Sequence, residues 1–362
     1  MKFIPVSHSW VALHPQPKGV VQFIGGALFG TISSTFFYQS LLKFVYDQGY
    51  TIILLPFKFT FNHYQEAGFL IGEQYEIIPE LVRLSVLNSY DYTAYLDNEN
   101  FYWLGHSIGC KYISLLEGFS SLPDTPQARQ LFIEKISSKT QSLQRQQLTI
   151  AEIETLIQDL QLQVMHVKQY IKNLVGHEII LGDRIATLFI KGQISVLIAP
   201  DNSDTQSAIQ FKPLANLLDR YGWGVFPTPA ETNNLIIESN LFNRLGLVYF
   251  KSDTTAQTTV DDFINLIDKP DEKYQSIQLG GHLRPLGFGF FNLVINPFDF
   301  LYAWVRYISK IDKQKAANLA PLFQPKEVRD SELEQIIIDL YSGLQNLNRL
   351  NKESKDNLII ST

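Results

Sequence analysis

Short, largely apolar runs that alternate with helical patterns are the feature that most constrains the fold of this chain. The runs lie at residues 20–24, 51–55, 101–104, 194–199 and 245–250. A shorter strand is expected at residues 276–279. Helical patterns separate the first three runs, at residues 34–47 and 64–87. Strands that are apolar throughout are typical of a parallel sheet covered on both faces. The sequence therefore predicts the α/β class, with a mostly parallel sheet flanked by helices.

The composition excludes several classes of protein. With 45% hydrophobic and 18% charged residues, the chain is not expected to be disordered. The formal net charge of −6 gives no electrostatic reason to expect nucleic acid as a partner. Cys110 is the single cysteine, which excludes an intramolecular disulfide framework. The first residues match neither a secretory signal nor a transit peptide, so we expect a cytoplasmic location.

The most apolar stretch, residues 286–305, predicts a buried or interfacial segment, most simply a core helix. Asn292, Asn296, Pro297 and Asp299 interrupt it. A transmembrane helix needs about 20 largely apolar residues without such breaks. The aromatic residues of this stretch are candidates to line an apolar pocket or to contact a lipid surface. Peripheral contact with a membrane is therefore one of the partner interactions that the sequence suggests.

Residues 125–176 break the alternation and predict a helical hairpin inserted into the α/β domain. Thr125 followed by Pro126 is typical of a helix start. A capping-box pattern beginning at Thr149 is expected to open the second helix. Apolar residues then recur from Ile150 to Leu174 in alternating steps of three and four, as in a coiled-coil seam. Three interpretations are open: a packing arm, a lid over the site, or a homodimer seam through residues 150–174.

The chain is thus expected to consist of an interrupted core and two helical additions. The α/β core comprises residues 1–124 and 177–312, and the hairpin comprises residues 125–176. Residues 313–362 form a polar C-terminal helical tail, in which a second capping-box pattern at Ser331 is expected to open the helix.

A G-x-S-x-G motif, GHSIG at residues 105–109, follows the third apolar run and precedes a helical pattern. This context is that of a nucleophile elbow, which presents a serine on a strained strand-to-helix turn. Glycines flank the serine because side chains there would clash in the tight turn. The N-terminus of the following helix stabilises developing negative charge. Ser107 is therefore the candidate nucleophile.

An elbow also requires an oxyanion hole built from backbone amides, which are fixed donors. Ile108, the residue after the serine, is the candidate first donor. Gly25, Gly26 and Ala27 end the first apolar run and can supply the second donor. The alternative interpretation of Gly25 and Gly26 is a simple turn that ends a strand.

An acid and a histidine should follow later strands, in the order Ser, Asp or Glu, His. Asp253 comes after the run at 245–250 and is the preferred acid; Asp201 and Asp204 are the alternative acids. His282 follows the last expected strand. In this arrangement His282 takes the proton from Ser107, and Asp253 orients the imidazole. The competing interpretations are a turn-capping aspartate at Asp253 and a surface-loop histidine at His282.

With these residues in place, the chain resembles the α/β-hydrolase superfamily and, more closely, the DUF1350 family of cyanobacterial and plastid proteins. The motifs that carry the resemblance are FIGGALFG at 23–30, GHSIGCK at 105–111, APDNSDT at 199–205, FKSDTT at 250–255 and LGGHLRPL at 279–286. The resemblance covers most of the chain up to about residue 310. It implies an α/β-hydrolase fold, a triad of Ser107, Asp253 and His282, and a photosynthetic bacterial origin. It implies no particular substrate.

Two functions of different class follow from these residues. The first is a serine hydrolase acting on an ester or thioester, for which the apolar residues 286–304 favour a hydrophobic acyl substrate. The second is a non-catalytic α/β-hydrolase scaffold that binds a lipid or protein partner, because one fold hosts unrelated functions. Nucleotide binding is disfavoured, since the glycines of residues 25–30 do not have G-x-G-x-x-G spacing. We expect no cofactor and no metal.

Overall fold

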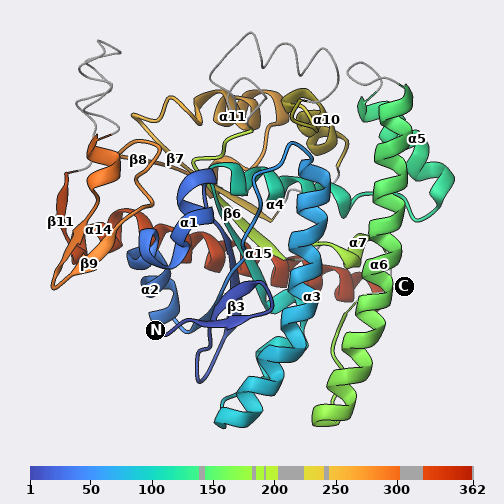
Figure 1. The fold of residues 1–362 in the computed structure, drawn as a ribbon, viewed down its shortest axis with the longest axis horizontal. Helices are drawn as coiled ribbons and strands as arrows, with labels where there is room; N and C mark the ends of the chain where they lie inside the picture. The colour runs from blue at the N-terminus through green and yellow to red at the C-terminus, as the bar shows by residue number, and fades with distance from the viewer. Residues whose placement is uncertain are drawn as a thin grey trace.

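An eight-stranded sheet forms the centre of the molecule (Figure 1), in the order β1-β2-β4-β3-β5-β6-β7-β8. The computed structural model describes residues 1–137, 143–181, 185–190, 193–202, 224–239, 244–301 and 321–360. The strands are β1 Ile4–Val6, β2 Ser9–Ala12, β3 Gly19–Ile24, β4 Tyr50–Leu54, β5 Phe101–His106, β6 Ile194–Ile198, β7 Leu245–Phe250 and β8 Gln275–Gln278. Strand β2 pairs antiparallel with β1 and β4, and the other pairs are parallel.

Helices cover both faces of this sheet. The described α-helices are α1 Ala27–Phe37, α2 Gln39–Asp47, α3 His63–Asn88, α4 Ile108–Phe119, α5 Pro126–Ser137, α6 Leu143–Val175, α7 Ile185–Leu188, α10 Pro229–Glu238, α11 Gln257–Asp261, α14 Lys326–Arg329 and α15 Gln335–Ile360. On β5, the ring of Tyr102 packs against Tyr341 of α15, whereas Gly105 faces Ile113 of α4. Because residues three apart on a strand point to opposite faces, α15 and α4 lie on opposite sides of the sheet.

The predicted fold class is confirmed. Every residue of β3, β4, β5 and β6 is buried, as expected for apolar strands in a parallel sheet covered by two helical layers. The sheet is mostly parallel and flanked by helices, which is the architecture implied by the resemblance to α/β hydrolases. Parallel strands have their carboxyl ends at one edge, so the residues after β3, β5, β6, β7 and β8 meet there.

The prediction of a core helix in residues 286–305 is wrong for its first half. Strands β9 Phe288–Phe290 and β10 Leu293–Ile295 form an antiparallel pair, and β11 Phe323–Pro325 extends it to a three-stranded sheet. Gly287 has φ +151° and Phe291 has φ +52°, conformations that end a helix and allow a tight turn. Tyr302 and Trp304 lie outside the described residues. Within the described residues, no helix combines the length and apolarity needed to cross a membrane.

The expected helical hairpin corresponds to α5 and α6, and α6 lies along α3 (Figure 1). The start of the second helix was predicted wrongly: α6 begins at Leu143, so that Thr149 is buried inside the helix rather than capping it. The apolar seam is buried within the chain, at Ile153, Ile157, Leu160, Val164, Val167 and Ile171. The face on which the homodimer expectation rested is therefore occupied, which fits the packing-arm interpretation.

The C-terminal residues begin their helical region earlier than predicted. Ser331 was expected to open the helix, but α14 already begins at Lys326, and Ser331 lies in a π-helical segment, Asp330–Glu334. The hydroxyl of Ser331 donates to the Val328 carbonyl of α14. Helix α15 packs against β6 and β7, and the Tyr341 hydroxyl donates to the Trp103 carbonyl at 3.1 Å. The described part of the expected tail thus contributes to the core.

Candidate active site

The G-x-S-x-G motif forms a sharp turn between β5 and α4. Ser107 has φ +57° and ψ −126°, a conformation that costs energy for any residue with a side chain. A Cβ atom at Gly109 would lie 2.3 Å from the Ile24 carbonyl oxygen, and one at Gly105 would lie 2.7 Å from the Ile113 side chain. Glycine is therefore required at both positions, and the turn holds the serine hydroxyl at the carboxyl edge of the sheet.

Three residues predicted for the site are joined by hydrogen bonds. The Oγ atom of Ser107 lies 2.9 Å from Nε2 of His282. The Nδ1 atom of His282 lies 2.8 Å from Oδ2 of Asp253. The other oxygen of Asp253 accepts hydrogen bonds from the backbone amides of Thr255, at 2.8 Å, and Ala256, at 3.0 Å. The structure thus places a serine, a histidine and an acid in hydrogen-bond contact, with the acid itself held in place.

The alternative acids differ in their position. Asp201 follows β6, and its backbone amide donates to the Ser107 carbonyl at 3.2 Å. Its carboxylate acts on His282 electrostatically and favours the protonated imidazole. Asp204 lies outside the described residues. Of the two described candidates, Asp253 is the one hydrogen-bonded to the imidazole.

Charge around the imidazole favours its protonated form. Burial alone would lower the pKa of His282, but the carboxylate of Asp253, with smaller contributions from Asp201 and Asp299, raises this pKa above its ordinary value. Burial also acts to raise the pKa of Asp253, but His282 and the backbone amides outweigh it and lower this pKa. Asp253 is therefore ionised at neutral pH, and His282 is a competent proton acceptor.

Two backbone amides remain candidates for the oxyanion donors. Ala27 and Ile108 are the first residues of α1 and α4, which follow the neighbouring strands β3 and β5. The first amides of a helix have no acceptor within the helix, so both can donate to a bound group. Gly25 instead allows close backbone approach, since a Cβ atom there would lie 2.7 Å from the Gly30 Cα.

Gly26 is not a free donor, contrary to its prediction as part of the oxyanion hole. Its amide donates to the Tyr38 hydroxyl at 2.8 Å. The absence of a side chain at Gly26 is still important, because a Cβ atom there would lie 3.3 Å from the Ser107 Cβ. A glycine there keeps the approach to the serine open.

A buried hydrogen-bond chain that sequence reasoning missed connects the two halves of the site. The Tyr38 hydroxyl, which accepts from the Gly26 amide, donates to His106 Nδ1 at 2.7 Å. Nε2 of His106 then donates to the carbonyl oxygen of His282 at 2.8 Å. Burial lowers the pKa of His106 to about 3, so its imidazole is neutral and carries one proton. The chain ties the loop after β3 to the loop that carries His282.

A second set of contacts holds the His282 loop from the other side. The Gly281 amide donates to the carboxylate of Asp299 at 3.0 Å, and the side-chain amide of Asn296 donates to the Leu283 carbonyl at 2.9 Å. Asp299 is buried, and burial raises its pKa. Asn296 and Asp299 are two of the polar residues that interrupt the apolar stretch, and their role was visible in the sequence only as that interruption.

Tyr38→Phe is expected to destabilise the fold by about 1–3 kcal/mol, because it leaves the Gly26 amide and His106 Nδ1 buried without their partner. Urea unfolding measures this change. Tyr46→Phe is the matched control: its hydroxyl donates to the Leu13 carbonyl away from the site, so its loss should cost less and leave the reactivity of Ser107 unchanged. If the Tyr38→Phe and Tyr46→Phe variants had the same stability and the same reactivity of Ser107, the hydrogen-bond chain through Tyr38 would have no role in the site.

One further group of side chains could hold a cation. Among the described residues, His8, Glu73 and Glu76 bring their donor atoms within 4.8 Å of one another. None of them belongs to the group around Ser107. Their spacing in the sequence gave no signal, since His8 lies in the β1–β2 turn and the two glutamates lie on α3.

Comparison with known proteins supports the family resemblance over part of the chain. Residues 2–143 match the model of a family described as "Protein of unknown function (DUF1350)", so the predicted resemblance is confirmed there. Similar solved structures include a butyrate-bound thermophilic esterase from the Planctomycetes species Thermogutta terrifontis, with 10% identity and a TM-score of 0.39, covering 86% of this chain and 90% of that one. Another is an acetyl ester-xyloside bifunctional hydrolase from Caldicellulosiruptor lactoaceticus, with 10% identity and a TM-score of 0.36, covering 83% and 86% respectively. No curated protein matches the sequence.

Proposed function

We propose that this protein is a serine hydrolase that cleaves an ester or thioester of a hydrophobic acyl group. The observation that carries the proposal is the hydrogen-bond chain from Ser107 through His282 to Asp253, which starts at a serine held in a strained turn. A serine hydroxyl is a weak nucleophile until an adjacent base can take its proton. Here the base is in contact with the hydroxyl, and a buried carboxylate orients the base.

The reaction follows from this geometry. As Oγ of Ser107 attacks the acyl carbon, His282 Nε2 takes its proton, and the imidazolium is stabilised by the Asp253 carboxylate. The amides of Ala27 and Ile108 donate to the oxyanion that forms. The imidazolium then gives its proton to the departing alkoxide or thiolate, leaving an acyl-enzyme. Water, activated by His282, cleaves the acyl-enzyme and regenerates Ser107.

An exposed apolar patch supports a hydrophobic substrate and contact with a lipid surface. Its side chains lie on α1 and on the β9–β10 hairpin: Ile32, Phe36, Phe290, Phe291 and Leu293. Phe36 stacks on Phe288 with ring centroids 5.3 Å apart, so the two elements form one surface. Helix α1, which carries Ile32 and Phe36, begins at Ala27, the proposed oxyanion donor. Large exposed apolar patches mark interaction surfaces.

A double variant, Phe290→Ser/Phe291→Ser, should reduce binding to neutral phosphatidylcholine vesicles by about tenfold or more. Each of the two replaced aromatic side chains would contribute roughly 1.5 kcal/mol or more to the free energy of vesicle binding through apolar burial. Sedimentation with vesicles measures the bound fraction. The control is Leu131→Ser/Leu162→Ser, which removes two exposed apolar side chains from the α5–α6 hairpin instead. Equal binding by both variants would argue against the patch as the contact surface.

The substrate class can be tested with p-nitrophenyl esters and acyl thioesters of short, medium and long chains. The full-length protein should hydrolyse them with a rate that rises with chain length, and the Ser107→Ala variant serves as the blank. Hydrolysis that never exceeds this blank would overturn the proposal. It would leave the scaffold interpretation, in which the same surface binds a lipid or protein without turnover.

A further inference from the structure

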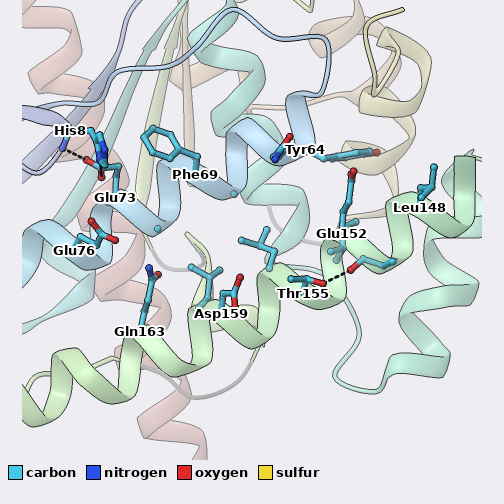
Figure 2. Close-up of a pocket in the computed structure, with 17 residues that line it drawn as sticks. His8, Tyr64, Phe69, Glu73, Glu76, Leu148, Glu152, Thr155, Asp159 and Gln163 are labelled. Atoms are coloured by element: carbon cyan, nitrogen blue, oxygen red, sulfur yellow. Dashed lines mark hydrogen bonds and ion pairs between the residues drawn. The ribbon is translucent and has the colours of Figure 1, made fainter. Parts of the chain in front are cut away.

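A cavity of about 560 Å³ lies between α3 and α6 (Figure 2). None of Ser107, Asp253 and His282 lines it. Its volume falls in the range of about 300–1,000 Å³ that is typical of small-molecule pockets. The pocket follows α3 from Tyr64 to Glu76, which at about 1.5 Å per residue corresponds to roughly 18 Å. The cavity is therefore long enough for an extended ligand.

The lining carries negative charge along this length. Four carboxylates line it, Glu73 and Glu76 from α3 and Glu152 and Asp159 from α6. In Figure 2, Glu73 and Glu76 lie at one end, Glu152 lies towards the other, and Asp159 lies between them. None of the described residues that line the cavity is a lysine or an arginine. Two basic residues act on these groups without lining the cavity: Arg145 acts on Glu152, and Lys58 lies over the Phe69 ring, 5.9 Å from its centroid. Four carboxylates against the single histidine of the lining, His8, favour a cationic ligand, and their distribution favours several positive charges in a row.

Aromatic and aliphatic side chains fill the spaces between the carboxylates. The rings of Tyr64 and Phe69 line the cavity from α3, and Leu156 and Leu160 line it from α6. Aromatic faces attract ammonium groups, and aliphatic walls accept methylene groups by apolar contact. A ligand that alternates ammonium and methylene segments would satisfy both kinds of surface.

The side chain of Gln163 indicates independently that the ligand donates hydrogen bonds. This residue lines the cavity opposite Gly72, where a Cβ atom would lie 3.7 Å from the Gln163 side chain. Its amide oxygen Oε1 is buried and has no hydrogen-bond partner among the described residues. A buried acceptor left without a donor costs free energy. A ligand that donates hydrogen bonds would remove this cost.

We propose that the cavity binds a linear aliphatic polyamine, with its ammonium groups at Glu76, Asp159 and Glu152 and its methylene groups against the leucines. A single metal ion at His8, Glu73 and Glu76 fits the observations less well. Both oxygens of Glu73 already accept short hydrogen bonds, from the hydroxyls of Ser7 and Ser9 at 2.8 Å each. An ion there would also leave Glu152 and Asp159 unused.

Isothermal titration of the full-length protein with spermidine tests the proposal. We expect saturable binding of one spermidine per chain, and no binding of an uncharged diol of similar length. The variant Glu76→Gln/Asp159→Asn should weaken binding by about tenfold or more, because it removes two charge-assisted hydrogen bonds. Both side chains are exposed, so the variant should fold normally, which circular dichroism verifies.

A charge-matched control separates the cavity from general charge. Glu272→Gln/Glu327→Gln removes two exposed carboxylates that do not line the cavity, and it should bind spermidine like the parent. Absence of binding, or equal weakening in both variants, would overturn the proposal. Tight binding of Mn²⁺ that is lost in a Glu76→Gln variant, with no binding of spermidine, would overturn it in favour of a metal site.

Discussion

Ser107→Ala is expected to lower kcat for ester hydrolysis by ~10⁶-fold, because it removes the atom that forms the acyl-enzyme. The folded structure should be retained, since alanine lacks only the hydroxyl and the strained backbone of the turn is set by the surrounding glycines. Steady-state kinetics on an activated acyl ester measures the loss, and chemical unfolding measures the stability.

Ser114→Ala is the matched control for this variant. Ser114 lies on α4, the helix that follows Ser107, is buried, and donates its hydroxyl to the Cys110 carbonyl at 2.9 Å. The same substitution there should leave kcat unchanged and cost about 1 kcal/mol of stability. A Ser107→Ala protein that is folded and retains the rate of the parent would remove Ser107 from the mechanism.

Asp253→Asn is expected to lower kcat by ~10⁴-fold, because an amide at this position no longer holds the imidazole in the required tautomer or stabilises its charge. Asp201→Asn provides the comparison, since Asp201 influences His282 only through its charge. It should lower kcat far less. If the two variants were impaired equally, or if Asp201→Asn were the more damaging, the assignment of the acid would be wrong.

The pH dependence of the reaction gives a second check on the same residues. His282 must be neutral to accept the proton from Ser107, and its pKa is raised above the ordinary value of 6.5, burial being outweighed by Asp253. Activity should therefore fall as the pH drops through this raised pKa, with the midpoint above 6.5. In Asp253→Asn, burial dominates and the midpoint should move to lower pH. An unchanged midpoint would contradict the proposed pairing.

Those parts of the fold that depend on local patterns could be predicted from the sequence. The central strands were recognisable because each is buried on both faces and is therefore apolar throughout. The turn around Ser107 was recognisable because two close approaches, at Gly105 and Gly109, admit no side chain. The proximity of Asp253 and His282 to Ser107 could be predicted because parallel strands bring their carboxyl ends to one edge, so position after a strand indicates proximity.

The parts that depend on contacts between distant segments could not be predicted. Tyr38 and His106 are 68 residues apart, and nothing in the sequence around Tyr38 indicates a buried acceptor. The Gly26 amide was misassigned because its partner, the Tyr38 hydroxyl, is set by this tertiary contact. The strands β9 and β10 were predicted as a helix because an apolar stretch carries no clear period, and the decisive feature is the backbone conformation at Gly287 and Phe291.

The start of α6 illustrates a different limit. The capping-box pattern at Thr149 is a valid helix start, but residues 143–148 are also good helix formers. The helix therefore extends through the pattern to Leu143. A local signal for a helix end is overridden when the preceding residues can continue the helix and pack.

Labelling with a fluorophosphonate probe, followed by mass spectrometry of the labelled peptide, tests the central claim most directly. We expect the 362-residue protein to be modified at Ser107 alone, the Asp253→Asn variant to be modified more slowly, and the Ser107→Ala variant to remain unmodified. A well-folded parent protein that remains unlabelled, or a label on another residue, would contradict the proposal that Ser107 is an activated nucleophile.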